Sequence, residues 1–499
     1  MPPVIRPLAS LTRSGIALLI TAALLSPQIA FAQTPDATPQ LPEGPLGVQI
    51  QWLLDTLNTP ASNPSTSDQL GEHFTADFLK QVPATQLVAV FDQLHGQAGT
   101  VTIEASSLVT SRDMPPTNAR FILVGEHGTR LQASIQIDRE SGKIAGLVFQ
   151  PATAAASPPA ASPAASPAAT TYRDEDVQFT SGPDRIYGSL MVPKSAATPL
   201  PAALIISGSG PTDRNGNSGT LTAMNTNLNL ARTLADNGVI SLRYDKLGSG
   251  RTGLGTHTNG EGIDYNLFLQ EARDATAFLM SQPSVDPGRL ILVGHSEGAL
   301  FALVLAQELT AAGTPPAGVI LVSPLSIRYL DILKDQLEPQ FAQAVEGGQM
   351  TQQQADDARQ ELDTIITSLR TNGTLPETIS SPALAQIFSP TNAAFLAQID
   401  KIDPAEVAAS LPSTLPVLVL HGGKDQQVTV AQVQHLMAGF EQAGNTEATL
   451  VELPDADHLM KVITGTPNPA VDYANPDLPF SPKAVEAITE FLAAHGLAG

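Results

Sequence analysis

A serine-containing turn constrains the fold of this chain more than any other sequence feature. Residues 290–293 form a short apolar run typical of a buried strand, and residues 299–305 are typical of a helix. Between them, residues 294–298 read G-H-S-E-G, the G-x-S-x-G pattern of a sharp strand-to-helix turn that exposes a serine hydroxyl. Glycine suits both ends of this turn because side chains there would collide with the neighbouring strand and helix. We therefore predict Ser296 as a nucleophile, the alternative being an ordinary turn with a solvent-facing serine.

The N-terminal segment has the pattern of an export signal. Arg6 and Arg13 flank the start of an apolar run over residues 15–25, and Ala-Phe-Ala at 30–32 forms a small-x-small cleavage site. We expect residues 1–32 to direct export to the periplasm or the medium. The apolar run is too short to span a bilayer, and no later stretch is long enough, so we predict no membrane span.

Composition excludes several kinds of chemistry and partner. The 499 residues include no cysteine, which removes disulfides, thiolate metal sites and cysteine nucleophiles. The formal charge is −22, and loss of the two arginines with the signal would make it −24. A surface this acidic repels nucleic acid and anionic lipid, so we expect neither as a partner and interpret the charge as aiding solubility.

A biased segment divides the chain into two folded parts. Residues 151–171 are almost entirely Ala, Ser, Pro and Thr, a composition typical of a semi-extended spacer. Residues 44–150 precede it and show helical patterns followed by strand patterns, which indicates a small α+β domain. In this order of elements the domain resembles the nuclear-transport-factor-2-like modules found ahead of some secreted bacterial hydrolases. The predicted helices are 46–57, 67–79 and 84–94, and the predicted strands are 101–110, 119–125, 130–138 and 143–149.

Downstream of the spacer, strand and helix patterns alternate over residues 172–499. Such alternation indicates a mostly parallel sheet covered by helices on both faces. The exception is 325–415, which has helical patterns, including a capping box at 351–354, but no strand pattern. Because about ninety residues far exceed a normal connection, we predict a helical cap inserted over the catalytic edge of the sheet. The alternative is a helical appendage away from the site.

A serine nucleophile needs a base and an orienting carboxylate, which follow this type of turn in the order Ser, Asp or Glu, His. Of the nine histidines, five lie before the serine or within its turn, His421 precedes the best candidate acid, and His435 and His495 lie in predicted helices. This leaves His458, in a loop just past the predicted strand 449–453. Asp425 follows the preceding strand, 417–420, and is the predicted acid. Asp455 and Asp457 are rivals because they adjoin the histidine in sequence.

The reaction also needs hydrogen-bond donors for a developing oxyanion. We assign one to the backbone N–H of Glu297, directly after the nucleophile, and the other to the N–H of Ser209 in the Gly/Ser-rich loop after strand 203–206. The same loop imitates the start of a calcium site at 213–217. Ser218 stands where such a site requires glycine and Met224 where it requires glutamate, so we predict no metal.

Five segments together resemble the α/β-hydrolase superfamily, specifically secreted bacterial esterases and dienelactone-hydrolase-like or prolyl-peptidase-like serine hydrolases. They read G-S-G-P-x-D-R-x-G-N, R-Y-D-K, G-H-S-E-G, H-G-x-x-D and D-x-D-H, in that order. The resemblance covers about 172–499 and departs at Asn215, where Asp is expected, and at Leu247, where Arg is usual. It implies an α/β-hydrolase fold, hydrolysis of small carboxylic esters through an acyl-enzyme, and no cofactor.

Two other functions stay open at this stage. An aminopeptidase or acyl-peptide hydrolase would hold a substrate N-terminus with acidic groups from the cap, where Asp356, Asp357 and Glu361 are candidates. A non-catalytic binding protein on the same fold is the third possibility, against which the intact serine, aspartate and histidine in the correct order argue. The sequence decides neither the natural substrate nor the oligomeric state.

Overall fold

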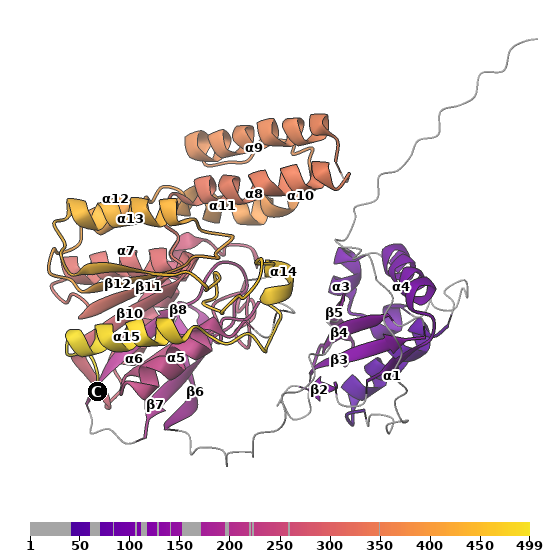
Figure 1. The fold of residues 1–499 in the computed structure, drawn as a ribbon, viewed down its shortest axis with the longest axis horizontal. Helices are drawn as coiled ribbons and strands as arrows, with labels where there is room; N and C mark the ends of the chain where they lie inside the picture. The colour runs from indigo at the N-terminus through magenta and orange to yellow at the C-terminus, as the bar shows by residue number, and fades with distance from the viewer. Residues whose placement is uncertain are drawn as a thin grey trace, which may run out of the picture. The chain divides into compact units, whose positions relative to one another are not determined.

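The computed structural model forms two compact units, residues Met1–Ala164 and Ala165–Gly499. It describes residues 41–499 except for gaps at 60–69, 83, 105–106, 111–116, 127–128, 140, 152–170, 195–198, 219–220, 222–223, 258–259 and 349. The predicted export signal at 1–32 lies outside the described residues, as does nearly all of the predicted spacer at 151–171. Figure 1 shows the helices and strands of both units.

The first unit is an α+β fold in which helices precede an antiparallel sheet. Its helices α1, α3 and α4 pack their apolar residues on the sheet and form one core, with Phe74, Phe91 and Phe121 fully buried. The sheet has the order β1-β3-β4-β5, and β2 also pairs with β3. The elements are α1 (Pro45–Leu57), α3 (Ala76–Gln81), α4 (Ala84–Ala98), β1 (Val101–Ile103), β2 (Val109–Thr110), β3 (Asn118–Gly125), β4 (Arg130–Ile137) and β5 (Ile144–Pro151).

Two elements predicted as continuous in this unit are interrupted in the structure. The helix predicted over 67–79 is interrupted, because Phe74 forms a bridge with Ile144 and the Thr75 hydroxyl then accepts the Phe78 amide to begin α3. The strand predicted over 101–110 is divided into β1 and β2, which pair separately with β3. In both places a long-range backbone pairing overrides the local apolar pattern.

The second unit contains an eight-stranded sheet of order β13-β12-β11-β10-β8-β9-β7-β6. Six neighbouring strands run parallel, and the β6–β7 hairpin joins the sheet antiparallel to β9. This confirms the predicted α/β-hydrolase sheet. The strands are β6 (Tyr172–Ser181), β7 (Asp184–Pro193), β8 (Leu200–Ile206), β9 (Ile240–Tyr244), β10 (Val285–His295), β11 (Gly318–Val322), β12 (Val417–Gly422) and β13 (Ala448–Leu453).

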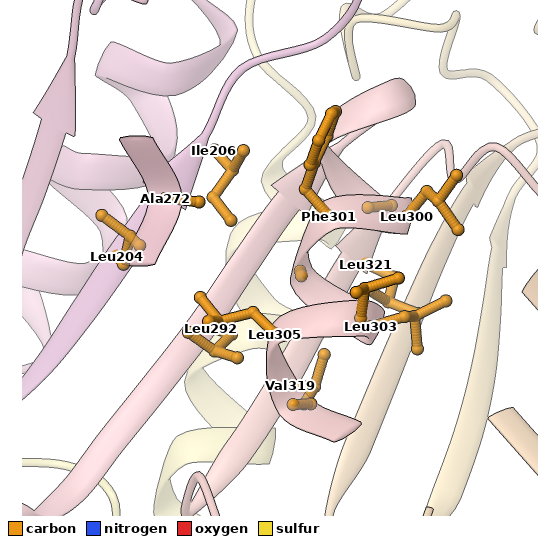
Figure 2. Packing of buried hydrophobic residues seen from close by; sticks show 14 of the residues in the cluster. Leu204, Ile206, Ala272, Leu292, Leu300, Phe301, Leu303, Leu305, Val319 and Leu321 are labelled. Atoms are coloured by element: carbon orange, nitrogen blue, oxygen red, sulfur yellow. The ribbon is translucent and has the colours of Figure 1, made fainter. Parts of the chain in front are cut away.

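Helices cover both faces of this sheet, as the alternating pattern predicts (Figure 1). One face packs against α6 (Tyr265–Met280), α7 (Glu297–Ala311), α12 (Pro404–Ala409) and α13 (Val430–Gln442). The other packs against α5 (Thr226–Asp236) and α15 (Pro482–Ala494). Figure 2 shows Phe301, Leu303 and Leu305 of α7 among strand residues of the first face, which anchors the helix that follows the serine.

The predicted cap is present between β11 and β12. Helices α8 (Tyr329–Glu346), α9 (Gln352–Asn372), α10 (Pro382–Ile387) and α11 (Pro390–Ile399) form their own apolar core. The buried Asp400 holds this cap at its base, because its carboxylate accepts hydrogen bonds from Arg328 and Arg370 at 2.8 Å each. Gln336 of α8 donates to the carbonyl of Gln427 at 3.0 Å, so the cap lies over the edge where β12 ends rather than away from it.

Among the helices of the described residues, none combines the length and apolar character needed to cross a membrane.

Candidate active site

Ser296 lies in a strained backbone conformation between β10 and α7. Its φ of 55° and ψ of −121° place a non-glycine residue in a sparsely populated region, a cost that persists only where the surroundings impose it. The Ser296 amide donates to the Val322 carbonyl at 2.9 Å, and its own carbonyl accepts the amides of Ala299 and Leu325 at 3.0 Å each. These bonds hold the turn between two strands and a helix, and the serine is left partly exposed.

The two glycines of the motif are required by close backbone approach. A methyl group at 294 would collide with the carbonyl oxygen of Gly298, and one at 298 would collide with that of Ile206. The motif therefore reflects a tight packing of β8, β10 and the first turn of α7.

His458 and Asp425 form a direct hydrogen-bonded pair. The Nδ1 atom of His458 lies 2.8 Å from Oδ2 of Asp425, and both side chains are almost completely buried. The other carboxylate oxygen of Asp425 accepts the amides of Gln427 and Val428 at 2.7 and 3.0 Å. Burial by itself would raise the pKa of the Asp425 carboxyl, but the charge of His458 and these hydrogen bonds outweigh it and hold the pKa below its ordinary value. The carboxylate is thus fixed, ionised and aimed at the imidazole.

Two further glycines allow close contact between the loop after β12, which carries Asp425, and the loop after β13, which carries His458. A methyl group at Gly422 would collide with the carbonyl oxygen of Ala456, and one at Gly423 would lie 2.8 Å from the Cα of Pro454. The Lys424 amide also donates to the Ala456 carbonyl at 2.9 Å. The H-G-G-K-D segment therefore presents Asp425 against the loop that carries His458.

His295 joins the histidine loop to the serine turn. Its Nε2 donates to the backbone carbonyl of His458 at 3.0 Å, and the two imidazole rings lie 5.0 Å apart between centroids. Burial, together with the charge of His458, lowers the pKa of His295 to about 3, so His295 stays neutral and keeps this contact at physiological pH. Because His295 adjoins Ser296, the contact brings the Asp425–His458 pair to the edge of the sheet where the serine lies.

The two rival aspartates differ from Asp425 in their surroundings. Asp455 is exposed, and Oδ1 of the buried Asp457 accepts the amides of Leu459 and Lys461 at 2.9 and 2.8 Å. Burial raises the pKa of Asp457 to about 6, in spite of those two hydrogen bonds and the nearby charges. Asp457 shapes the turn that follows His458, whereas the carboxylate bonded to the imidazole is that of Asp425.

The loop that follows β8 lies directly against the nucleophile. A Cβ atom placed on Gly208 would lie 3.2 Å from the Cβ of Ser296, so the backbone here approaches the serine as closely as glycine permits. Ser209, the next residue, is exposed, and Glu297 is the first residue of α7, where backbone amides lack intrahelical partners. The two predicted oxyanion donors thus come from segments that flank Ser296.

Other residues singled out in the sequence hold local structure. Asp213 accepts the amides of Asn215 and Asn217 and so closes the turn that imitates a calcium loop. In the cap, Asp356 accepts from Arg359, Asp357 accepts from Gln353, and Glu361 accepts the Ser380 and Ser381 amides.

The sequence alone indicates no role for two residues near the site, Lys246 and Tyr329. Lys246 lies in the quoted R-Y-D-K segment and contacts both Gly208 and Glu297. Tyr329 lies in the first turn of the cap, and burial together with the charge of the nearby Glu297 raises the pKa of its hydroxyl. The R-Y-D-K segment identifies the lysine as part of the family pattern. Its partners are distant in sequence, so only the fold reveals them.

Two protein families match parts of this chain. Residues 218–461 match the family described as "Serine aminopeptidase, S33", and residues 41–142 match one described as "ORF 12 gene product N-terminal". No curated protein matches the chain. The sheet order, the serine turn and the first of these matches identify the second unit as a member of the α/β-hydrolase superfamily. It is therefore a hydrolase of a group that includes esterases and peptidases.

Solved structures with a similar chain path include three enzymes. The Pyrococcus furiosus esterase Pf2001 is 17% identical with a TM-score of 0.42, over 68% of this chain and 97% of that one. A dienelactone hydrolase-like promiscuous phosphotriesterase from metagenomic libraries is 17% identical with a TM-score of 0.38, over 66% and 100%. The proline iminopeptidase of Mycobacterium smegmatis is 13% identical with a TM-score of 0.41, over 65% and 99%.

Proposed function

We propose that this protein is a serine carboxylesterase that acts through an acyl-enzyme on Ser296. The observation that carries the proposal is the buried 2.8 Å hydrogen bond between His458 and Asp425, joined through His295 to the strained turn that holds Ser296. A histidine oriented by an ionised carboxylate beside a constrained serine is the arrangement that activates a hydroxyl for nucleophilic attack.

In the proposed reaction, the Ser296 Oγ attacks the ester carbonyl carbon while His458 takes the hydroxyl proton. The carbonyl π bond becomes an oxyanion, which the backbone N–H groups of Glu297 and Ser209 stabilise. Collapse of this intermediate breaks the ester C–O bond, and His458 returns its proton to the departing alcohol. Water then attacks the acyl-serine in the same way, with His458 again as base, and releases the carboxylic acid. Asp425 holds the imidazole tautomer with its proton on Nδ1 throughout.

The second candidate is an aminopeptidase, which the description of the matching family favours. Such an enzyme needs carboxylates free to hold a substrate ammonium group. The three cap acids with this potential, Asp356, Asp357 and Glu361, are engaged with partners inside the cap. For this reason we place ester hydrolysis first and do not extend the reaction to peptides.

Substrate preference is tested with a panel of p-nitrophenyl esters of increasing acyl length beside aminoacyl p-nitroanilides. We expect turnover of esters, and loss of about 10⁴- to 10⁶-fold in kcat in Ser296→Ala with the fold retained. Faster turnover of anilides than of esters would favour the peptidase. Retention of more than a tenth of the activity in Ser296→Ala would exclude Ser296 as the nucleophile.

Export of the protein remains a proposal as well, since it depends on residues 1–32. N-terminal sequencing of the protein recovered from the periplasm or medium of a producing bacterium should give a mature chain beginning near Gln33. A chain that retains residues 1–32 and stays in the cytoplasm would contradict the proposal.

A further inference from the structure

Lys246 is a buried cation beside the serine turn that the proposed reaction does not use. It lies two residues past the end of β9, is only 8% exposed, and its Nζ lies 5.3 Å from the centre of the Phe268 ring. Its Nζ donates to the carbonyl of Gly208 at 2.5 Å and lies 3.4 Å from Oε1 of Glu297. Burying an ammonium group costs several kcal/mol unless its partners compensate, so these contacts determine where it can reside.

The carbonyl that Lys246 holds belongs to the peptide unit joining Gly208 and Ser209. In a trans peptide the C=O and N–H bonds point in opposite directions from one rigid plane. Fixing the Gly208 oxygen on the ammonium therefore fixes the direction of the Ser209 N–H. That N–H is the second proposed oxyanion donor, and Gly208 itself lies against the Cβ position of Ser296.

The same lysine reaches the residue that supplies the first donor. The Glu297 carboxylate pairs with Lys246, and Tyr329 at the start of the cap lies near enough to feel its charge. Glu297 is only 4% exposed. One ammonium group thus links the β8 loop, the first turn of α7 and, through Glu297, the cap.

We propose that Lys246 is a positioning residue that orients the Ser209 N–H toward the oxyanion through its hydrogen bond to the Gly208 carbonyl. The proposal rests on the proposed esterase function. It distinguishes Lys246 from the groups that touch substrate, since the ammonium group is buried and its contacts are with Gly208 and Glu297. A loosened Gly208–Ser209 peptide would weaken binding of the transition state more than binding of the ester.

The experiment compares Glu297→Gln with the double variant Lys246→Met/Glu297→Gln. The pair is chosen because Lys246→Met alone would leave Glu297 buried without its cation, a defect unrelated to the oxyanion loop. The single variant retains the ammonium on Gly208, and the double variant removes it without leaving a buried charge. Lys334→Met, which breaks an ion pair with Asp363 on the cap surface, serves as a control for loss of a lysine and should leave kcat unchanged.

We expect the double variant to lose about 10- to 100-fold in kcat relative to Glu297→Gln, with KM changed less than twofold. This is smaller than the roughly 10²- to 10³-fold cost of deleting an oxyanion donor outright, because the donor remains but is less ordered. Affinity for a trifluoromethyl ketone, which forms a tetrahedral oxyanion on the serine, should fall by the same factor as kcat. Active sites are counted by the acyl-enzyme burst, so that kcat refers to folded enzyme.

Equal kcat per active site in the two variants would overturn the role of Lys246, as would a loss confined to KM or to the number of active sites. The proposed function fails separately: a wild-type protein that turns over no ester and forms no covalent adduct on Ser296 would exclude the esterase itself. Turnover by the wild type together with equal kcat in both variants would exclude the lysine proposal alone.

Discussion

The loops that follow β12 and β13 each place a buried aspartate next to His458, and the two carboxylates behave in opposite ways. Asp425, in the first loop, accepts hydrogen bonds from the imidazole and from two amides, and its pKa is lowered by the charge and hydrogen bonds that outweigh burial. Asp457, in the second loop, is bonded through Oδ1 to amides of its own turn. Its Oδ2 has no hydrogen-bond partner within the part of the chain that the structure describes, and burial raises its pKa to about 6.

This difference shows that distance along the chain is a poor guide to which acid serves a histidine. Asp457 adjoins His458 in sequence, but its carboxylate organises the turn over residues 457–461. Asp425 is 33 residues from His458 in sequence, and the close packing of the two loops brings its carboxylate to the imidazole ring. Ionisation follows from the charge and the hydrogen-bond donors that face each carboxylate, and not from burial alone.

Among the changes that test this comparison, Asp425→Asn has the largest expected effect. The amide keeps the size of the side chain but cannot stabilise the imidazolium and favours the wrong histidine tautomer, so kcat should fall about 10⁴-fold. Steady-state kinetics on a p-nitrophenyl ester measure this. The comparison between the loops fails if Asp457→Asn is the more damaging substitution of the two.

A smaller loss is expected when the contact between the loops is forced apart. Gly422→Ala would place a methyl group against the Ala456 carbonyl and shift the loop that carries His458. A displacement of about 1 Å at a catalytic group can cost on the order of 10²-fold in rate, and we expect a fall of that size in kcat. Gly465→Ala is the matched control, because a methyl group there meets nothing within 4 Å. Equal activity in the two variants would show that the loop contact does not position His458.

Asp457→Asn should change stability rather than catalysis. The folded pKa of about 6 lies above the ordinary value of 3.8, so the folded state binds the proton more tightly than the unfolded chain. The free energy of unfolding therefore falls as pH rises from about 4 to about 6 and stays lower above that range. The variant should lack this dependence, which is worth on the order of 2–3 kcal/mol.

Urea unfolding of the wild type and Asp457→Asn at pH 4.5 and pH 7.5 tests the sign of this effect. We expect the variant to gain stability relative to the wild type at the higher pH while kcat stays within tenfold. An opposite shift, in which the wild type is favoured at pH 7.5, would mean that Asp457 is ionised by partners in the same way as Asp425.

The smallest effect is expected from removing the first unit. Both loops, the serine turn and the proposed oxyanion donors lie within Ala165–Gly499. A fragment beginning at Tyr172 should therefore hydrolyse small soluble esters with a kcat within about twofold of the full chain. A folded fragment that is inactive on every ester in the panel would show that groups outside this unit complete the site.

The sequence predicted the elements whose signal is local. The G-x-S-x-G turn between an apolar run and a helix and the capping box of α9 are each contained within a few consecutive residues. The alternation that gives the parallel sheet is a succession of short runs, each of which can be recognised by itself. The break in the helix predicted over 67–79 was not predictable in this way, because it depends on a bridge between Phe74 and the distant Ile144.

The same distinction applies to the candidate site. Chain order selected Asp425 and His458, but the choice between Asp425 and Asp457 depends on the directions of hydrogen bonds across two loops. The contacts of Lys246 with Gly208 and Glu297 span 38 and 51 residues, so no local pattern could reveal them. The catalytic roles of Ser296, Asp425 and His458 and of the two oxyanion donors stay predictions until the variants are measured.

The most direct test of the central claim is the rate and site of covalent labelling by a fluorophosphonate, read by peptide mass spectrometry. We predict one modified residue, Ser296, labelled rapidly in the wild type and in Asp457→Asn but far more slowly in Asp425→Asn and His458→Ala, because only the latter two lose the activated base. Absence of label on Ser296, or equal labelling rates in Asp425→Asn and the wild type, would contradict the account.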